Sequence, residues 1–349
     1  MNLRNVIKHR YVWMCVAIVW TIFYHGNFRV NRETISIVKS IGFAGVDIFL
    51  FASGIGCYYS LEKDSDCFRF ITRRIVRIIP TYWIFMIVWS MYKRSFSGMT
   101  FRAILGNFLC VRNFTGLRED FNWYISAMWL MYFLAPFFKG VLDRINSIYI
   151  VLLFTVFLGL VSVCFWDADI LIITMTRLPI FFLGMYVGKL AWNNAYISKL
   201  TLLWLWILME MGVRLYFHWS GVHAEQMWSR GYYWYPFILV IPGLCMLISC
   251  LMEVLKKAFG KVGEGIEKVL ELPGKFSFEL YLIHVWFFDV LNNNWFPAGK
   301  AVDEMKTWVM AAVALIPACL VLRSLSKMVM VIIDKWAKVC TKINGIRKE

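Results

Sequence analysis

Charged side chains are scarce in this sequence. Of its 349 residues only 17% are Asp, Glu, Lys or Arg, whereas 60% are hydrophobic and the mean hydropathy is +0.62. Soluble domains are about 45–50% apolar and about 25% charged, so the composition excludes an ordinary soluble domain. It also excludes a disordered chain, because so many apolar residues cannot stay solvated. The composition therefore predicts a polytopic membrane protein.

Features that would indicate other classes of protein are missing. None of the nine cysteines forms a CxxC pair, and most lie in apolar runs, so we expect small-hydrophobe roles and no metal site. Arg4, Lys8 and Arg10 precede the first apolar run without a small-residue cleavage site after it, which predicts an uncleaved first span. No repeat is visible. We expect one membrane domain, residues 1–349 with a core of about 10–333, a short cytoplasmic tail and no appended soluble domain.

The apolar stretches predict an all-α bundle of about ten transmembrane helices. A bilayer core needs about 20 apolar residues per helix. The sixth stretch is interrupted by Arg177 and Pro179, and the ninth is short. The predicted spans are 11–28, 42–61, 75–92, 123–139, 148–166, 173–191, 200–217, 233–252, 276–291 and 307–333.

The distribution of positive charge predicts the orientation. The formal net charge is +15, and about two thirds of the 37 Lys and Arg residues fall on the inner side if the N-terminus is cytoplasmic. We therefore expect an even number of spans with both termini in the cytoplasm, and a lipid bilayer instead of nucleic acid as the partner of the positive loops. His9 is expected at the cytoplasmic flank of the first span.

Ionisable residues inside a membrane span are costly and indicate function, and three candidates emerge. They are His25 near the outer end of the first span, Asp47 in the second and His284 in the ninth. His25 and Asp47 have similar predicted depths on neighbouring helices, so the carboxylate could orient the imidazole as a base. The alternative is an interfacial histidine and an aspartate with a local partner. His218 and His223 are expected to be solvated in an outer loop.

A second feature is cationic. Arg73, Arg74 and Arg77 lie at the inner start of the third span, and Arg74 and Arg77 share a helix face. Two guanidinium groups on one face suit bidentate contacts with phosphate. Arginines at an inner boundary are also what the positive-inside rule predicts.

Five blocks together resemble a known family. In order they are Tyr24-His25, GVDIFLFASG (45–54), RRIVRIIPTY (73–82), NWYIS (122–126) and SFELYLIH (277–284). They are similar in sequence and spacing to motifs of the acyltransferase family 3 membrane proteins, from about residue 10 to residue 330.

The resemblance implies a bacterial inner-membrane enzyme with about ten helices and no permanently bound cofactor. Such enzymes move an acyl group, usually acetyl, from acetyl-CoA to a hydroxyl of a surface or secreted carbohydrate. His25 matches the catalytic histidine, and Arg74 with Arg77 matches the arginine pair that binds the acyl-CoA donor, with Arg73 as a further cation. The family's usual arginine on the first helix falls on Met14 here, which leaves Arg10, on the same helix face, as its candidate substitute.

On this reading His25 acts as a general base or as a transient acyl carrier, and Asp47 fixes its tautomer. Trp123 and Tyr124 are candidates for the acceptor path, and Glu279 and His284 for the same cavity. Glycan-synthesis proteins are candidate partners. A glycan transporter or flippase is the alternative function, with buried charges as its pathway, and a scaffold without chemistry is a third.

Overall fold

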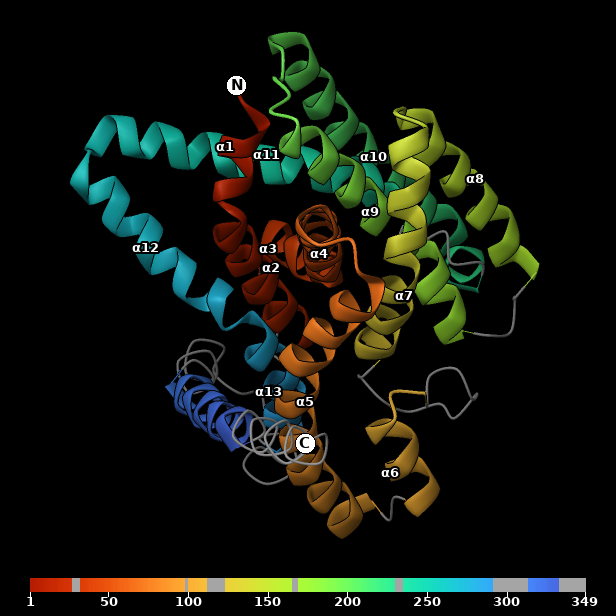
Figure 1. Ribbon diagram of the computed structural model, residues 1–349, viewed down its shortest axis with the longest axis vertical. Helices are drawn as coiled ribbons and strands as arrows, with labels where there is room; N and C mark the ends of the chain where they lie inside the picture. The colour runs from red at the N-terminus through yellow and green to blue at the C-terminus, as the bar shows by residue number, and fades with distance from the viewer. Residues whose placement is uncertain are drawn as a thin grey trace, which may run out of the picture.

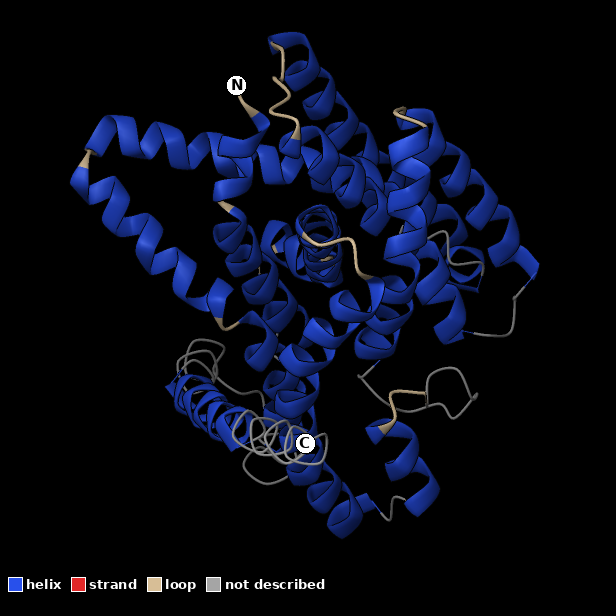
Figure 2. Cartoon of the chain, viewed as in Figure 1, coloured by secondary structure: helices blue, strands red, loops and turns tan. Residues whose placement is uncertain are grey.

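The structure is a computed structural model that describes residues 1–26, 32–97, 100–111, 123–164, 169–229, 235–290 and 313–332. Every regular element among these residues is a helix (Figure 2). The helices are α1 (Leu3–Lys8), α2 (Arg10–His25), α3 (Glu33–Ser40), η1 (Gly42–Ala44), α4 (Gly45–Lys63), α5 (Cys67–Ser97), α6 (Phe101–Phe108), α7 (Trp123–Arg144), α8 (Ile148–Cys164), α9 (Asp169–Trp192), α10 (Lys199–Ser229), α11 (Pro236–Phe259), α12 (Lys261–Lys275), α13 (Ser277–Val290) and a last helix, Val313–Ile332.

The predicted all-α class is confirmed, and each of the ten predicted stretches overlaps one of these helices. Within the described residues, six helices are long and apolar enough to cross a membrane: α4, α5, α7, α10, α11 and Val313–Ile332. Ile148–Ser162 and Ser277–Phe288 are shorter apolar helices. The count of ten spans and the cytoplasmic termini stay predictions. Residues 307–312 and the predicted tail after 333 lie outside the described residues.

Helix α4 runs through the middle of the bundle, where Figure 1 shows it almost end-on with the other helices around it. Its residues are apolar on all sides, as in Phe49, Leu50 and Phe51, which are all buried. A helix that is hydrophobic all round is stable only when it is enclosed. The segment with the family-like motif is therefore the core of the bundle.

Glycines allow α4 and α9 to cross at close range. A Cβ atom added at Gly54 would lie 2.1 Å from the carbonyl oxygen of Phe181, and one at Gly184 would lie 2.2 Å from the carbonyl oxygen of Phe51. Small residues bring membrane helices into backbone contact in this way. The helix α9 also continues through Pro179, which the sequence analysis treated as an interruption.

Four helices meet at His9. This side chain, between α1 and α2, is buried; its Nε2 contacts Glu253 of α11 at 2.9 Å and its Nδ1 contacts Glu267 of α12 at 2.5 Å. Lys256 contacts the second oxygen of Glu267 at 2.5 Å. His9 is thus enclosed by neighbouring helices, because α12 folds back over it after the turn at Gly260 (Figure 1).

The glycine contacts predict a position-specific effect on stability. Gly54→Ala should lower the thermal stability of the purified protein, because overpacking of this kind costs about 1–3 kcal/mol. Gly56→Ala, two residues along the same helix, is the matched control, since nothing lies within 4 Å of a Cβ added there. Thermal unfolding of both variants in the same detergent measures the difference. Equal melting temperatures would contradict the close α4–α9 crossing.

Candidate active site

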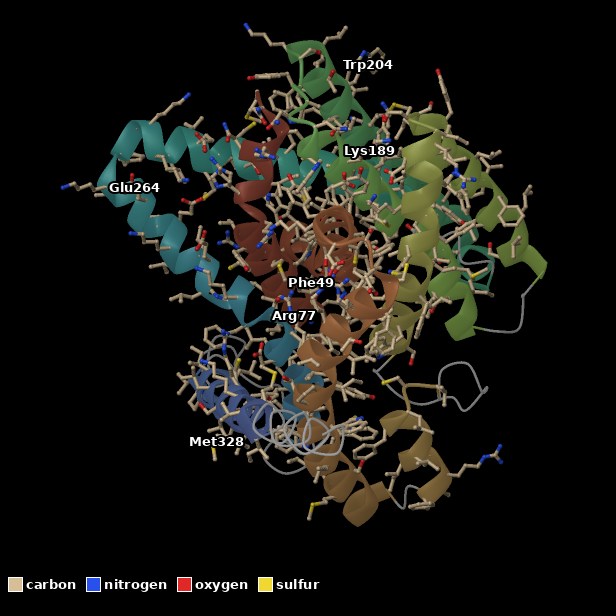
Figure 3. The ribbon with its side chains drawn as sticks, in the orientation of Figure 1. Phe49, Arg77, Lys189, Trp204, Glu264 and Met328 are labelled. Atoms are coloured by element: carbon tan, nitrogen blue, oxygen red, sulfur yellow. The ribbon has the colours of Figure 1, made fainter. Side chains whose placement is uncertain are left out.

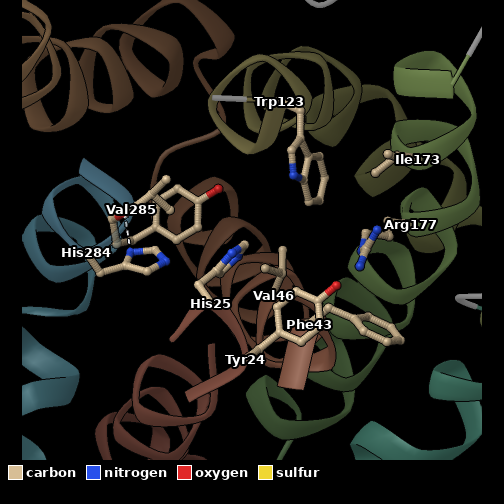
Figure 4. Close-up of a pocket in the computed structure, with 10 residues that line it drawn as sticks. Tyr24, His25, Phe43, Val46, Trp123, Ile173, Arg177, His284 and Val285 are labelled. Atoms are coloured by element: carbon tan, nitrogen blue, oxygen red, sulfur yellow. Dashed lines mark hydrogen bonds between the residues drawn. The ribbon is translucent and has the colours of Figure 1, made fainter. Parts of the chain in front are cut away.

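A cavity of about 170 Å³ lies within the bundle, between the C-terminal end of α2, the start of α4, and α7, α9 and α13 (Figure 4). Apolar and aromatic side chains form most of its wall. Two imidazoles and one guanidinium complete the wall. The lining residues are Tyr24, His25, Phe43, Val46, Trp123, Ile173, Arg177, Tyr281, His284 and Val285.

His25 is the last residue of α2 and remains exposed to the cavity. The ring of Tyr24 packs edge-on against it, with the ring centroids 4.9 Å apart. Gly26, the next residue, adopts an extended conformation and ends the helix. The sequence therefore presents an accessible imidazole at a helix end, next to an aromatic wall.

His284 faces His25 from α13, with the two ring centroids 5.2 Å apart (Figure 4). It is fully buried, and its Nδ1 lies 2.7 Å from the carbonyl oxygen of Tyr281. A carbonyl only accepts hydrogen bonds, so Nδ1 carries the proton and donates it. The Nε2 atom is consequently an acceptor, and it has no partner among the described residues. The structure thus brings these two predicted site residues together.

Asp47 does not pair with His25 as predicted. Its Oδ1 accepts a hydrogen bond of 2.9 Å from Nε of Arg177, and both side chains are only 2% exposed. A guanidinium inside an apolar bundle stays charged and needs a carboxylate beside it. Asp47 meets this need across the α4–α9 crossing, and its Oδ2 has no partner among the described residues.

Arg177 is the site residue that the sequence analysis missed. The sequence analysis treated it only as an interruption of the sixth stretch, whereas it lies within α9 and lines the cavity. Its guanidinium also lies 4.8 Å from the ring centroid of Trp123, a cation–π contact. The sequence contained a signal for it. Arg177 lies in an apolar stretch, and an ionisable residue in such a stretch indicates function, which is the argument that selected Asp47.

The other predicted acceptor residues divide into two groups. Trp123 lines the cavity, but Tyr124 and Glu279 do not. Tyr124 is buried behind the wall, with its ring centroid 4.9 Å from that of Tyr281. Glu279 lies in the first turn of α13, where it interacts electrostatically with Arg323 and Arg77.

The predicted donor residues lie toward the N-terminal ends of α2 and α5, away from the cavity. The Arg74 guanidinium lies over Phe70 and Tyr132, 5.0 and 5.4 Å from their ring centroids, and donates to the Gly56 carbonyl oxygen at 3.3 Å. Arg10 lies 5.0 Å from the ring centroid of Tyr11. Arg77, which Figure 3 labels on α5, also interacts electrostatically with Tyr11.

Arg73 differs from its neighbours. It donates a hydrogen bond of 2.7 Å to Asp64, in the turn between α4 and α5. This bond lowers the pKa of the Asp64 carboxyl, so the carboxylate persists and neutralises Arg73. Arg73 therefore has a local partner that Arg77 does not share.

The sequence pattern of the acyltransferase domain family matches residues 13–323, which is most of the chain and includes every helix that lines the cavity. This chain belongs to acyltransferase family 3. No curated protein and no solved structure matches it. With its apolar helices, the family assignment makes the protein a multi-pass membrane acyltransferase, and it favours acyl transfer over the transporter and scaffold alternatives.

Metal ligands are not grouped in the part of the acyltransferase that the structure describes, where no cluster of three or more His, Cys, Asp or Glu side chains occurs. The cavity instead presents two imidazoles and the guanidinium of Arg177, which is paired with Asp47. These groups can accept a proton and stabilise a negative oxygen.

The Asp47–Arg177 pair predicts non-additive effects on stability. Asp47→Leu leaves a buried guanidinium without its carboxylate, which costs about 3–5 kcal/mol, whereas replacing both partners with apolar residues is often neutral. The double variant Asp47→Leu/Arg177→Met should therefore be more stable than Asp47→Leu alone. Thermal unfolding of the purified acyltransferase variants tests this order. A double variant that is less stable than either single variant would show that the pair is not coupled.

Proposed function

We propose that this acyltransferase transfers an acetyl group from acetyl-CoA to a hydroxyl of a cell-surface or secreted glycan, in the bacterial cytoplasmic membrane. The observation that carries the proposal is the cavity in which an accessible imidazole, a buried imidazole of fixed tautomer and a guanidinium converge. Acyl transfer to a hydroxyl needs a base and positive charge at the carbonyl oxygen.

The donor site lies at the inner end of α2. Arg10 and His25 are the first and last residues of this helix, about 22 Å apart along its axis. CoA carries its phosphates at one end and its thioester at the other, joined by a long flexible pantetheine arm. Its phosphates would bind near Arg10, Arg74 and Arg77, and the arm would extend through the bundle so that the thioester reaches His25.

His25 would act as the general base. It accepts the proton of the acceptor hydroxyl while the hydroxyl oxygen attacks the thioester carbonyl carbon. The new C–O bond gives a tetrahedral oxyanion, which collapses as the C–S bond breaks. The leaving CoA thiolate then takes this proton from the His25 imidazolium, so the products are the acetyl ester and free CoA, and His25 is again neutral.

His284 and Arg177 would support this step from opposite sides of the cavity in the view of Figure 4. His284 Nε2 can accept a hydrogen bond only, so it would orient His25 by accepting its N–H and leave the other nitrogen of His25 as the base. This is the positioning role that was predicted for Asp47. Arg177, held by Asp47, supplies a preorganised positive charge for the oxyanion.

The acceptor would lie against the aromatic wall. Tyr24, Phe43, Trp123 and Tyr281 surround the two histidines. Aromatic faces pack well on the apolar faces of sugar rings, and the hydroxyl groups of tyrosine add polar contacts. A glycan hydroxyl entering at the outer end of α2 would thus meet the thioester arriving from the inner end.

The first test concerns the histidines. His25→Ala should reduce the acetyl content of cell-surface glycans by about 100-fold or more, because it removes the base. Adding His284→Ala should cause little further loss, since residues that act as a unit are strongly non-additive. Mass spectrometry of glycans from cells with each variant measures this. His218→Ala, which changes an exposed histidine of α10, is the control and should leave the acetyl content unchanged.

Wild-type acetyl content in cells that carry His25→Ala at normal abundance would contradict the assigned base. Glycans that are identical with and without the gene would instead show that the acceptor is a different class of molecule.

The second test concerns the donor. Arg74→Ala and Arg77→Ala should each weaken acetyl-CoA binding by about tenfold or more, because losing a charged contact to phosphate typically costs about 1–3 kcal/mol. Arg73→Ala is the matched control on the same helix turn, and should change the affinity little because Asp64 already neutralises Arg73. Titration of the purified proteins with acetyl-CoA measures all three. Unchanged affinity in both Arg74→Ala and Arg77→Ala would leave these residues with an orienting role in the membrane only.

A further inference from the structure

Helix α10 has the most exposed membrane-spanning face in the described part of the chain. Only 11% of its 18 most apolar consecutive residues are buried, compared with 22–72% for the other five candidate spans. One side packs closely on α11, where a Cβ added at Gly212 would lie 2.8 Å from the Pro236 carbonyl oxygen. The opposite side points away from the bundle, and Figure 3 shows Trp204 at the periphery of the molecule.

The exposed side carries a seam with coiled-coil spacing. Six residues follow one another at intervals of three and four, and each is at least 37% exposed. An apolar repeat of this spacing is the pattern by which two helices pack side by side. The residues of this seam are Leu200, Leu203, Ile207, Glu210, Arg214 and Phe217.

Two members of the seam are charged. The Nε of Arg214 contacts Oε1 of Glu210 at 2.6 Å, with the side chains 78% and 59% exposed. Glu210 is eleven residues beyond Lys199, which begins the helix, so it lies about 16 Å into the span, close to the middle of a bilayer. Ionisable residues at this depth almost always face protein or water instead of lipid.

We propose that this seam is the interface with α10 of a second copy of the chain. In a two-fold dimer whose axis is perpendicular to the membrane, the two helices run parallel at the same depth. Glu210 and Arg214 then occupy successive core layers, so each glutamate lies next to the arginine of both copies. The four charges form a neutral cluster that is shielded from lipid.

Self-complementarity favours a second copy over an unrelated helix. The seam carries one acid and one base a single turn apart, so in an identical parallel helix each charge finds the opposite charge of the other copy one turn away. Polar residues at core positions of paired helices fix register and partner. The inference does not rest on the proposed function, since the cavity is lined by residues of α2, η1, α4, α7, α9 and α13 and none of α10.

Charge variants test the interface. Two differently tagged copies of the full chain are co-expressed, and the amount of the second copy that co-purifies with the first in mild detergent is measured. Glu210→Arg in both copies, or Arg214→Glu in both copies, should reduce co-purification by roughly tenfold, the size of an interhelical polar interaction in membranes. Combining one copy with Glu210→Arg and one with Arg214→Glu should restore it.

If Glu210 and Arg214 interacted only within their own helix, the mixed pair of variants would not restore co-purification. Failure of wild-type copies to co-purify, or failure of the mixed pair to recover when both copies are present in the membrane, would overturn the proposal.

A second measurement does not require that variants with altered charge insert into the membrane. Leu203→Cys places a thiol in the seam, and oxidation of isolated membranes should link two copies in high yield. Leu153→Cys on α8, an equally apolar position that is 63% exposed, is the control and should remain monomeric. The wild-type chain oxidised in parallel reports cross-links through native cysteines. No dimer with Leu203→Cys, or equal yields at both positions, would contradict the α10 interface.

Discussion

An arginine inside an apolar bundle must have a carboxylate beside it, and the rest of the site depends on how the fold satisfies this requirement. Arg177 in α9 and Asp47 in α4 meet at 2.9 Å, both almost fully buried. The glycines at Gly54 and Gly184 permit the close helix crossing that places them there. The pair thus fixes α9 against the central helix and sets one wall of the cavity.

The two histidines of the cavity have different surroundings, and the difference suits different tasks. His25 ends a helix and stays accessible, as a group that meets substrate must be. His284 is buried and donates from Nδ1 to a backbone carbonyl in its own helix, which fixes its tautomer. A buried ring of fixed tautomer is well suited to orient an accessible one.

The two ends of helix α2 correspond to the donor and the acceptor of the proposed reaction. Its N-terminal end lies among the cations Arg10, Arg77 and Lys275, which gather around Tyr11. Its C-terminal end presents His25 to the cavity. In the proposed reaction, a donor whose charged part binds at the Arg10 end would therefore act on an acceptor at the His25 end. The ionic cluster at His9 joins the start of this helix to α11 and α12.

The sequence by itself determined the helical class, the approximate positions of apolar helices such as α4, α7 and α11, and the motifs that identify the family, because hydropathy and local patterns are properties of contiguous residues. It also selected His25 and His284, since ionisable residues stand out in apolar stretches. Only the tertiary structure decided that Asp47 pairs with Arg177 and that Asp64 neutralises Arg73. Sequence position gives the depth of a residue along its helix, but the rotation and crossing of the helices decide which residues at one depth face each other.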